Sequence, residues 1–399
     1  MQKINIHTTH LADNFVWDLH KDLVNLIEVE STDDLFKLDG CNIILHTNKH
    51  IMCGEYERLR KINQPIRLKI LAFLNKNEKN KIIISNLWEC GQGEYDWLNL
   101  YELMPFAIDK RIVFVQAAPG HPTIEVGTFW MFTGLVANRD NVNCSLENFE
   151  KIYTKKDKPY TFNWMVGAGR PHRIALIQML HLAGALDDAL WSCHDHDYNE
   201  VEIKEKYKID VSPDNIRFNS LPSGYDNIPP PLTQTIRGDM YAIEKVFDFS
   251  VLGTMYNMVS QENQYIDSYF TVVAEQWHHW DYAEPNEKIL RPILMGHPFI
   301  FIGGQGLYKK LKDQGYKTFN SLIDESFDNI TDHATRLKRS ADVIASLAKS
   351  GRSNLDSFLS ASKEICEHNR LNLLARYGTQ QVTNHYNLHN FLIRNFANA

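Results

Sequence analysis

The chain has 399 residues, of which 44% are hydrophobic and 23% are charged, and it carries a formal net charge of −7. This composition excludes disordered, collagen-like and coiled-coil proteins and is typical of a globular protein with two or three domains. The negative charge provides no general attraction to phosphate backbones, so any contact with nucleic acid has to come from a local patch.

Two further properties bear on the environment in which the chain folds. Its six cysteines are scattered without C-x-x-C spacing, which predicts neither a disulfide framework nor a structural zinc site. No apolar run approaches the roughly 18 residues that a membrane helix needs, and residues 1–10 do not resemble a signal peptide. We therefore expect a cytoplasmic protein with reduced thiols and no membrane insertion.

Short apolar runs separated by longer mixed segments are the main structural pattern. They predict strands at residues 42–45, 81–85, 111–117, 160–165, 270–274 and 299–302. Because these runs do not alternate with polar residues, they are typical of parallel strands that are buried on both faces, with helices between them. The predicted fold class is α/β.

The spacing of the interruptions predicts the domain organisation. Gly, Pro, Asn and charged residues are frequent between residues 118 and 159, where we place the join between two Rossmann-like domains at 1–155 and 156–340. The proline-rich residues 211–232 predict a long surface excursion or lid. From Thr331 onward apolar residues recur at helical spacing, so residues 341–399 are expected to form C-terminal helices that pack back on the domains.

Residues 162–173 combine the end of a predicted strand, a turn that contains glycine, and the start of a helix. Backbone N–H groups and the positive end of a helix converge at such a turn, and Arg170 and Arg173 add two cations. This pattern predicts an anion-binding site, and a tight turn with two solvated arginines is the alternative. The glycines also resemble a dinucleotide-binding fingerprint, although His172 stands where the third glycine would be.

A second group of polar residues begins with Glu275 at the end of the predicted strand at 270–274. Asn286 is a good helix N-cap, which places Glu287 and Lys288 in the first turn of a helix. A carboxylate there can accept hydrogen bonds from paired ribose hydroxyls, and an adjacent ammonium group can face a diphosphate. The alternative is a glutamate that interacts only with the helix dipole, beside an exposed lysine.

The second predicted domain contains a specific series of sequence motifs. Its residues include, in this order, Glu275, Asn286-Glu287-Lys288, Arg291-Pro292-Ile293, Gly296-His297-Pro298-Phe299-Ile300, Gly303, Lys317-Thr318-Phe319 and Asp324-Glu325-Ser326. This series resembles the donor-site signature of phage- and virus-encoded glycosyltransferases, which are similar to exostosin-like and α1,3-fucosyltransferase-like enzymes. The resemblance covers residues 160–330 and is weak over the first domain. It implies the GT-B architecture, in which two Rossmann-like domains face each other across a cleft.

The resemblance also implies an activity and roles for individual residues. It implies an enzyme that uses a nucleotide-sugar donor and inverts the sugar carbon. Arg173, with Arg170 as its neighbour, would lie on the donor diphosphate. Glu287 would hold the donor ribose, and Lys288 would face phosphate. Asn286 stands where the family usually has threonine, and it caps a helix equally well.

Transfer of a sugar to a hydroxyl group requires a general base near that hydroxyl, and inverting GT-B enzymes usually supply the base from the first domain. Glu89, Glu94 and Asp96 follow the predicted strand at 81–85, and Glu89 is the first candidate because it is nearest to the strand. An acidic surface loop is the alternative for each of them. His46 and His121 follow two other predicted strands and are further candidates.

The segment Cys193-His194-Asp195-His196-Asp197 has the D-x-D spacing that binds a divalent ion in another glycosyltransferase architecture, and its ligand types would also suit zinc. Two cationic side chains already serve the leaving diphosphate, so we expect a metal-independent enzyme. The expected requirement is the nucleotide-sugar co-substrate, with no separate cofactor.

The expected acceptor is the hydroxymethyl group of a modified base in phage DNA, which would place the protein in the host cytoplasm, and a glycan is the alternative. A base would have to be flipped out of the duplex, and Trp277-His278-His279-Trp280 could stack on it or on a sugar. Two other classes stay open. One is an NAD-dependent sugar-nucleotide oxidoreductase or epimerase that uses the glycine turn, and the other is a non-catalytic sugar- or nucleic-acid-binding module.

Overall fold

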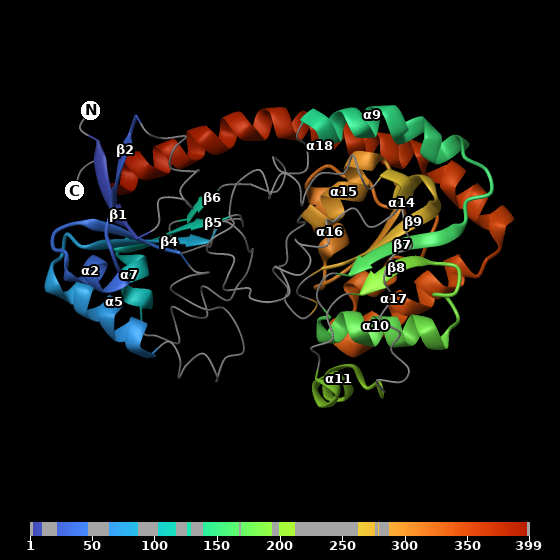
Figure 1. The fold of residues 1–399 in the computed structure, drawn as a ribbon, viewed down its shortest axis with the longest axis horizontal. Coiled ribbons are helices and arrows are strands. Elements are labelled where there is room, and N and C mark those ends of the chain that lie inside the picture. Colours follow the sequence, from blue (N-terminus) through green and yellow to red (C-terminus); the bar gives the residue numbers. More distant parts are fainter. Residues whose placement is uncertain are drawn as a thin grey trace. The chain divides into compact units, whose positions relative to one another are not determined.

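The computed structural model describes residues 3–9, 22–46, 64–86, 103–116, 126–128, 139–166, 169–193, 199–211, 262–275, 278 and 287–396. The chain divides into two compact units, the first made of Met1–Met131 and Gly378–Ala399 and the second of Phe132–Tyr377. Each unit contains one parallel sheet with helices beside it (Figure 1). The predicted α/β class is confirmed, and the two parallel sheets are compatible with two Rossmann-like domains.

The first sheet has six parallel strands in the order β2-β1-β3-β4-β5-β6. The strands are β1 (Ile4–Thr8), β2 (Val24–Glu28), β3 (Asn42–His46), β4 (Lys81–Asn86), β5 (Ile112–Gln116) and β6 (Val126–Thr128). The helices α2 (Thr32–Lys37), α5 (Gln64–Lys76) and α7 (Met104–Ile108) pack their apolar side chains against alternate residues of β3, β4 and β5. One face of this sheet is therefore covered by helices from the same part of the chain as its strands.

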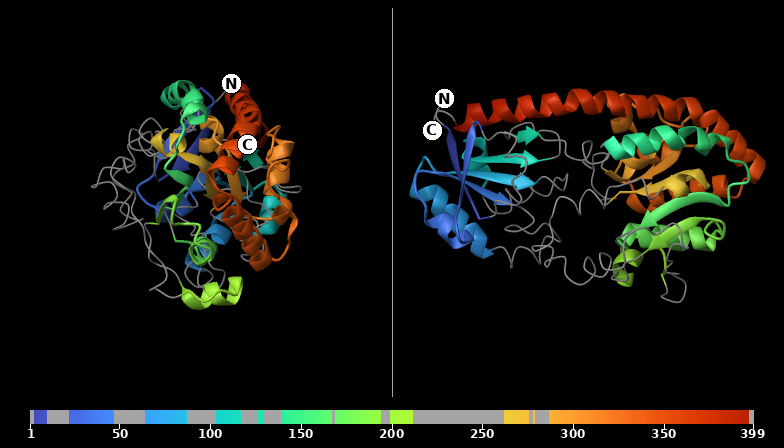
Figure 2. Two further views of the ribbon diagram at one scale, coloured as in Figure 1. Left: turned by 90° about the vertical axis from the view of Figure 1, so that its right-hand side faces the viewer. Right: turned by 45° about the horizontal axis from the view of Figure 1, so that its top comes forward.

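A second core of the first unit is formed with residues from the far end of the chain. Helix α18 (Arg352–Phe396) is continuous over 45 residues (Figure 2). Its residues Leu388, Phe391, Leu392 and Phe396 are buried among alternate residues of β1, β3, β4 and β5. These strand residues differ from those that contact α2, α5 and α7, so the end of α18 covers the other face of the sheet.

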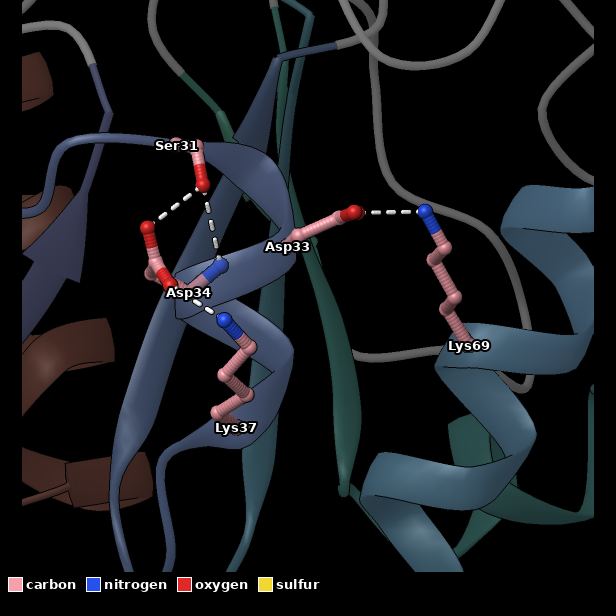
Figure 3. Close-up of polar contacts among 5 residues, drawn as sticks. All are labelled: Ser31, Asp33, Asp34, Lys37 and Lys69. Atoms are coloured by element: carbon pink, nitrogen blue, oxygen red, sulfur yellow. Dashed lines mark hydrogen bonds and ion pairs between the residues drawn. The ribbon is translucent and has the colours of Figure 1, made fainter.

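Polar side chains fix the first turn of the short helix α2 (Figure 3). The hydroxyl of Ser31 accepts a hydrogen bond from the backbone N–H of Asp34 at 3.2 Å and donates one to its carboxylate at 2.6 Å. Lys37 pairs with Asp34 at 2.7 Å, and Lys69 of α5 pairs with Asp33. Water screens these exposed ion pairs, so they orient α2 on α5 while apolar packing supplies most of the stabilisation.

The second sheet has four parallel strands in the order β10-β9-β7-β8. The strands are β7 (Tyr160–Val166), β8 (Leu190–Cys193), β9 (Ser268–Ala274) and β10 (Phe299–Ile302). Helices α9 (Arg139–Thr154), α14 (Glu262–Ile266) and α15 (Glu287–Met295) contact one another, as do α10 (Pro171–Leu182), α11 (Glu200–Tyr207) and α17 (His333–Ala348). The two groups lie on opposite faces of the sheet (Figure 1), and α16 (Leu307–Asp313) follows β10.

Both sheets place their first strand between their second and third strands. In the first unit β1 lies between β2 and β3, and in the second unit β7 lies between β8 and β9. Where the connections of two neighbouring parallel strands turn toward opposite faces of a sheet, the carboxyl ends of these strands form a topological switch point. Ligands of open α/β sheets bind at this switch point. In the second unit it lies at the ends of β7 and β9.

All six predicted strands are present, as β3, β4, β5, β7, β9 and β10, and their ends differ from the prediction by at most two residues. The apolar runs do not predict β1, β2, β6 and β8. β1 alternates buried with exposed or half-buried residues, and β2 buries only its first residue fully. β6 and β8 have three and four residues, so none of the four forms a long unbroken apolar run.

The boundaries of the two units differ from the expected domains. Helix α9, expected in a first domain ending at residue 155, packs with α14 and α15 in the second unit, where the Ser145 hydroxyl donates to the carbonyl of Leu294. The expected C-terminal part, 341–399, is divided between the units because α18 contributes to both. The proline-rich segment beyond Val211 lies outside the described residues.

The packing of α18 predicts that its end stabilises the first unit. Leu392 is 0% exposed, so Leu392→Ala should lower the free energy of unfolding of the first unit by about 2–5 kcal/mol, because it leaves a cavity in the core. Leu68 of α5 lies in the same unit and is 56% exposed, so Leu68→Ala should change stability by less than about 0.5 kcal/mol. Urea unfolding followed by hydrogen exchange in β3 to β5 measures both, and equal effects would contradict this packing.

Candidate functional site

The candidate site lies at the carboxyl edge of the second sheet, where α10 begins. Arg170 is the N-cap residue of α10 and has extended backbone angles, with φ −62° and ψ 150°. Pro171 occupies the first helical position, where a missing N–H group costs nothing and the fixed φ suits the helix. The side chains of Arg170, His172 and Arg173 are thus placed around the first turn of a helix of 12 residues.

Two of these side chains hold the end of β9. The Nε2 atom of His172 donates to the carbonyl of Glu275 at 2.7 Å, and Nη2 of Arg173 donates to the carbonyl of Ala274 at 2.9 Å. His172 and Arg173 are 3% and 5% exposed, whereas Arg170 is half-buried. The structure therefore joins the two groups of residues that the sequence singled out, and it places the guanidinium of Arg173 against the backbone of β9.

His278 extends this arrangement beyond β9. Its ring stacks on that of His172, with centroids 5.4 Å apart and planes inclined by 15°. The rings of Tyr207 and His333 lie 5.7 and 6.2 Å from it. We call His172, His278 and His333 the histidine cluster. His278 is fully buried, so its ring stacks on protein groups, and the expectation that it stacks on an acceptor is wrong for this residue.

A buried arginine of α17 connects the loops of this edge. Arg336 donates from Nε to the carbonyl of Gly303 at 3.1 Å, from Nη1 to that of Ile330 at 2.5 Å and from Nη2 to that of His278 at 2.6 Å. Nη2 also lies 2.9 Å from Nδ1 of His333, which therefore accepts. The sequence does not identify Arg336 as a site residue, because apolar spacing shows which face of a helix is buried but does not predict that an arginine is buried on that face.

Glu275 and Lys288, both expected at the donor, have different surroundings. Glu275 is 2% exposed, and a Cβ atom added at Gly303 would lie 3.0 Å from Cβ of Glu275 and 2.3 Å from a methyl carbon of Leu307. Glycine at position 303 therefore lets the side chain of Glu275 pack closely. Lys288 is half-buried in the first turn of α15, which begins at Glu287, and Asn286 lies outside the described residues.

Glu325 of the signature and Asp328, which lies just beyond it, maintain the fold. The backbone N–H of Phe319 donates to Oε1 of Glu325 at 2.6 Å, which closes the segment between them. The carboxylate of Asp328 accepts hydrogen bonds from the backbone N–H groups of Leu307 at 3.0 Å and Tyr308 at 3.1 Å. An internal carboxylate therefore occupies the start of α16, the helix that follows β10.

The histidine of the Gly-His-Pro segment is also part of the core. His297 lies within hydrogen-bond distance of two groups of β9, with Nδ1 2.9 Å from the Thr271 hydroxyl and Nε2 3.0 Å from the Ser268 carbonyl. The carbonyl can only accept, so Nε2 carries the proton and Nδ1 accepts from Thr271. Burial lowers the pKa of His297 to about 3. Gly296 has φ +67° and lies against Phe149 of α9, where a side chain would collide.

The structure describes few of the candidates for a base or for a metal site. Glu89, Glu94, Asp96 and His121 lie outside the described residues, and so do Asp195 and Asp197. His46 is the last residue of β3. Within the part of the chain that the structure describes, no group of three or more His, Cys, Asp or Glu side chains could hold a metal ion.

Comparisons with known proteins do not assign the chain to a family. No model of a protein family matches it, and no curated protein matches it at a significant level. Among the described helices, none combines the length and apolar character needed to cross a membrane.

The low pKa of His297 predicts a pH dependence of stability. In the unfolded chain a histidine has a pKa of about 6.5. The folded pKa is lower, so the stabilisation is complete above pH 6.5 and is lost as the pH falls toward 3, at about 1.4 kcal/mol per pH unit. His297→Gln should remove the contribution of this group, so that stability falls less between pH 7 and pH 5 than in the wild type. Urea unfolding at pH 7, 6 and 5 measures the difference, and an unchanged slope would contradict the assignment.

Proposed function

We propose that the chain is a nucleotide-sugar-dependent glycosyltransferase of GT-B architecture that transfers a sugar to an acceptor hydroxyl. The observation that carries the proposal is the joining of the first turn of α10 to the end of β9 through His172 and Arg173. This junction lies at the switch point of a parallel sheet, where α/β proteins bind nucleotides. It also brings together Arg173, to which the resemblance gives a role at the diphosphate, and Glu275, with which the resembling series begins.

The donor diphosphate is proposed to lie at the first turn of α10. Backbone N–H groups and the helix dipole favour an anion there. Arg170 and Lys288 are half-buried and can present cations to it, while Arg173 lies deeper, on the carbonyl of Ala274. Glu287 is proposed to hold the ribose, with Glu275 and Asn286 as its neighbours in the donor site.

In the proposed reaction the acceptor oxygen forms a bond to the sugar carbon while the bond from that carbon to the diphosphate oxygen breaks. The hydroxyl proton passes to a carboxylate of the first unit, with Glu89 ahead of Glu94 and Asp96. Attack from the face opposite the leaving group inverts the sugar carbon. Arg173 and Lys288 stabilise the charge that develops on the diphosphate, and this replaces a divalent ion.

The proposed acceptor is the hydroxymethyl group of a modified base in phage DNA, and a glycan is the alternative. An enzyme that acts on DNA in an infected cell would work in the host cytoplasm. The formal charge of −7 means that the DNA would be held by a local patch, so binding should be weak in the absence of the modified base.

A panel of nucleotide sugars tests the proposal, with hydroxymethylated DNA, unmodified DNA and glycans as acceptors. We expect transfer to hydroxymethylated DNA that persists in EDTA. If no nucleotide sugar is transferred or hydrolysed, the proposal fails. If EDTA abolishes activity and magnesium or manganese restores it, the metal-independent mechanism fails and Asp195 and Asp197 become the metal candidates. Binding of a nicotinamide dinucleotide in place of a nucleotide sugar would favour the oxidoreductase.

The proposed position of the diphosphate predicts a specific effect of Lys288. Lys288→Met should weaken the binding of a nucleoside diphosphate about tenfold or more, because a charge-assisted hydrogen bond to phosphate is lost. Lys312 lies on the exposed surface of α16, so Lys312→Met should leave the affinity unchanged. Titration calorimetry with UDP and GDP measures both. An equal loss in the two variants would indicate a general effect of charge and would contradict the proposed position.

A further inference from the structure

Arg336 is a buried arginine of α17 that connects several segments of the second unit. Its guanidinium binds the carbonyl of His278, four residues beyond the end of β9, and that of Gly303, the first residue beyond β10. It also binds the carbonyls of Ile330 and Thr331, which precede α17. Arg336 is 2% exposed, so a single buried side chain holds three connections at the carboxyl edge of the sheet.

We propose that Arg336 is a positioning residue for the donor site, and this inference rests on the proposed glycosyltransferase function. Arg336 fixes the loops after β9 and β10 at His278 and Gly303. These contacts in turn set the geometry of the first turn of α10.

Two chains of contacts connect Arg336 to the proposed diphosphate position. In the first, Arg336 holds the backbone of His278, the His278 ring stacks on His172, and His172 donates to the Glu275 carbonyl. In the second, Arg336 binds the carbonyl of Gly303, and the side chain of Glu275 packs beside the Cα atom of this glycine. Both chains end at Glu275, next to the carbonyl that Arg173 binds, so a displacement of Arg336 reaches the donor side chains by two routes.

The burial of this charge is compensated locally. Carbonyl oxygens accept from all three guanidinium nitrogens, so the donors are satisfied without a partner from solvent. Burial raises the pKa of Asp328, and backbone hydrogen bonds and the positive charge of Arg336 oppose that increase. Arg336 is thus held as a cation by groups of the protein and does not need the diphosphate as its counter-ion.

Arginine is required here because of its shape. A planar guanidinium directs N–H groups to several carbonyls at once, whereas a lysine ammonium is a point charge on a flexible stem. Arg336→Lys therefore keeps the charge and removes the simultaneous hold on His278 and Gly303. This substitution separates geometry from electrostatics.

Arg352 provides the matched control. It also donates to two backbone carbonyls, those of Lys158 at 2.6 Å and Pro159 at 3.2 Å. These residues directly precede β7, so they lie at the amino end of the strand, away from the proposed donor site. Arg352→Lys therefore removes the backbone contacts of an exposed arginine from the same unit without touching the donor site.

The experiment compares the full-length wild-type chain with Arg336→Lys and Arg352→Lys. Calorimetry with UDP and GDP gives the affinity, steady-state kinetics gives the donor KM and kcat, and hydrogen exchange reports on residues 275–290. We expect Arg336→Lys to weaken nucleotide binding and raise the donor KM at least tenfold, to change kcat less than threefold and to speed exchange in this segment. Arg352→Lys should change affinity and KM less than twofold.

The possible outcomes are distinct. Unchanged nucleotide affinity in a folded Arg336→Lys protein would overturn the inference while leaving the proposed function intact. An equal loss in both variants would show a general structural role and would also overturn it. If Arg336→Lys does not fold, His333→Ala decides, because it removes one partner of the guanidinium. A threefold or greater loss of affinity then supports the inference and an unchanged affinity overturns it. A wild-type chain that binds no nucleotide would refute the proposed function and, with it, this inference.

Discussion

Two buried carbonyl groups at the end of β9, those of Ala274 and Glu275, accept hydrogen bonds from side chains in the first turn of α10. A buried carbonyl group without a hydrogen-bond donor costs free energy. The carbonyl groups at the end of a central strand therefore need donors from the segment that follows the neighbouring strand. Here His172 and Arg173 supply the donors. This requirement fixes the position of α10 against β9, and the arrangement of the candidate site depends on it.

The two ends of the second sheet are held by different chemistry. Before β10, the neutral ring of His297 connects to Thr271 and Ser268 of β9 and has its pKa lowered by burial. At the carboxyl edge, Arg336 and the histidine cluster hold the loops. The amino end also carries the ion pair of Lys155 with Asp267. At the carboxyl edge the dipole of α10 favours an anion.

The sequence predicts those parts of the fold that leave a local pattern. The strand at 299–302 is predicted because burial on both faces makes it continuously apolar, and the helices after Thr331 are predicted from their apolar spacing. β1 is missed because its polar residues alternate with buried ones. The division of α18 between the units is missed because a continuous helix carries no local sign of its two partners.

The candidate site shows the same limit. The sequence places Arg173 and Glu275 near a common edge, since both follow strands of one parallel sheet. It groups His297 with the donor residues, whereas the structure places that side chain in the core. Arg336 gives no signal, because its burial depends on carbonyls from segments 33 and 58 residues away. Long-range contacts of this kind do not follow from periodicity or from a motif.

Photo-crosslinking tests the central claim most directly, because it reports where a nucleotide binds without depending on the acceptor or on turnover. A nucleoside diphosphate with an azido group on its base would be bound, irradiated and mapped by mass spectrometry of the digested chain. The account predicts labels in the second unit, within residues 167–175 or 275–290, that excess unlabelled nucleotide removes. Competable labels confined to the first unit, in the segments that follow β1 or β3, would contradict it.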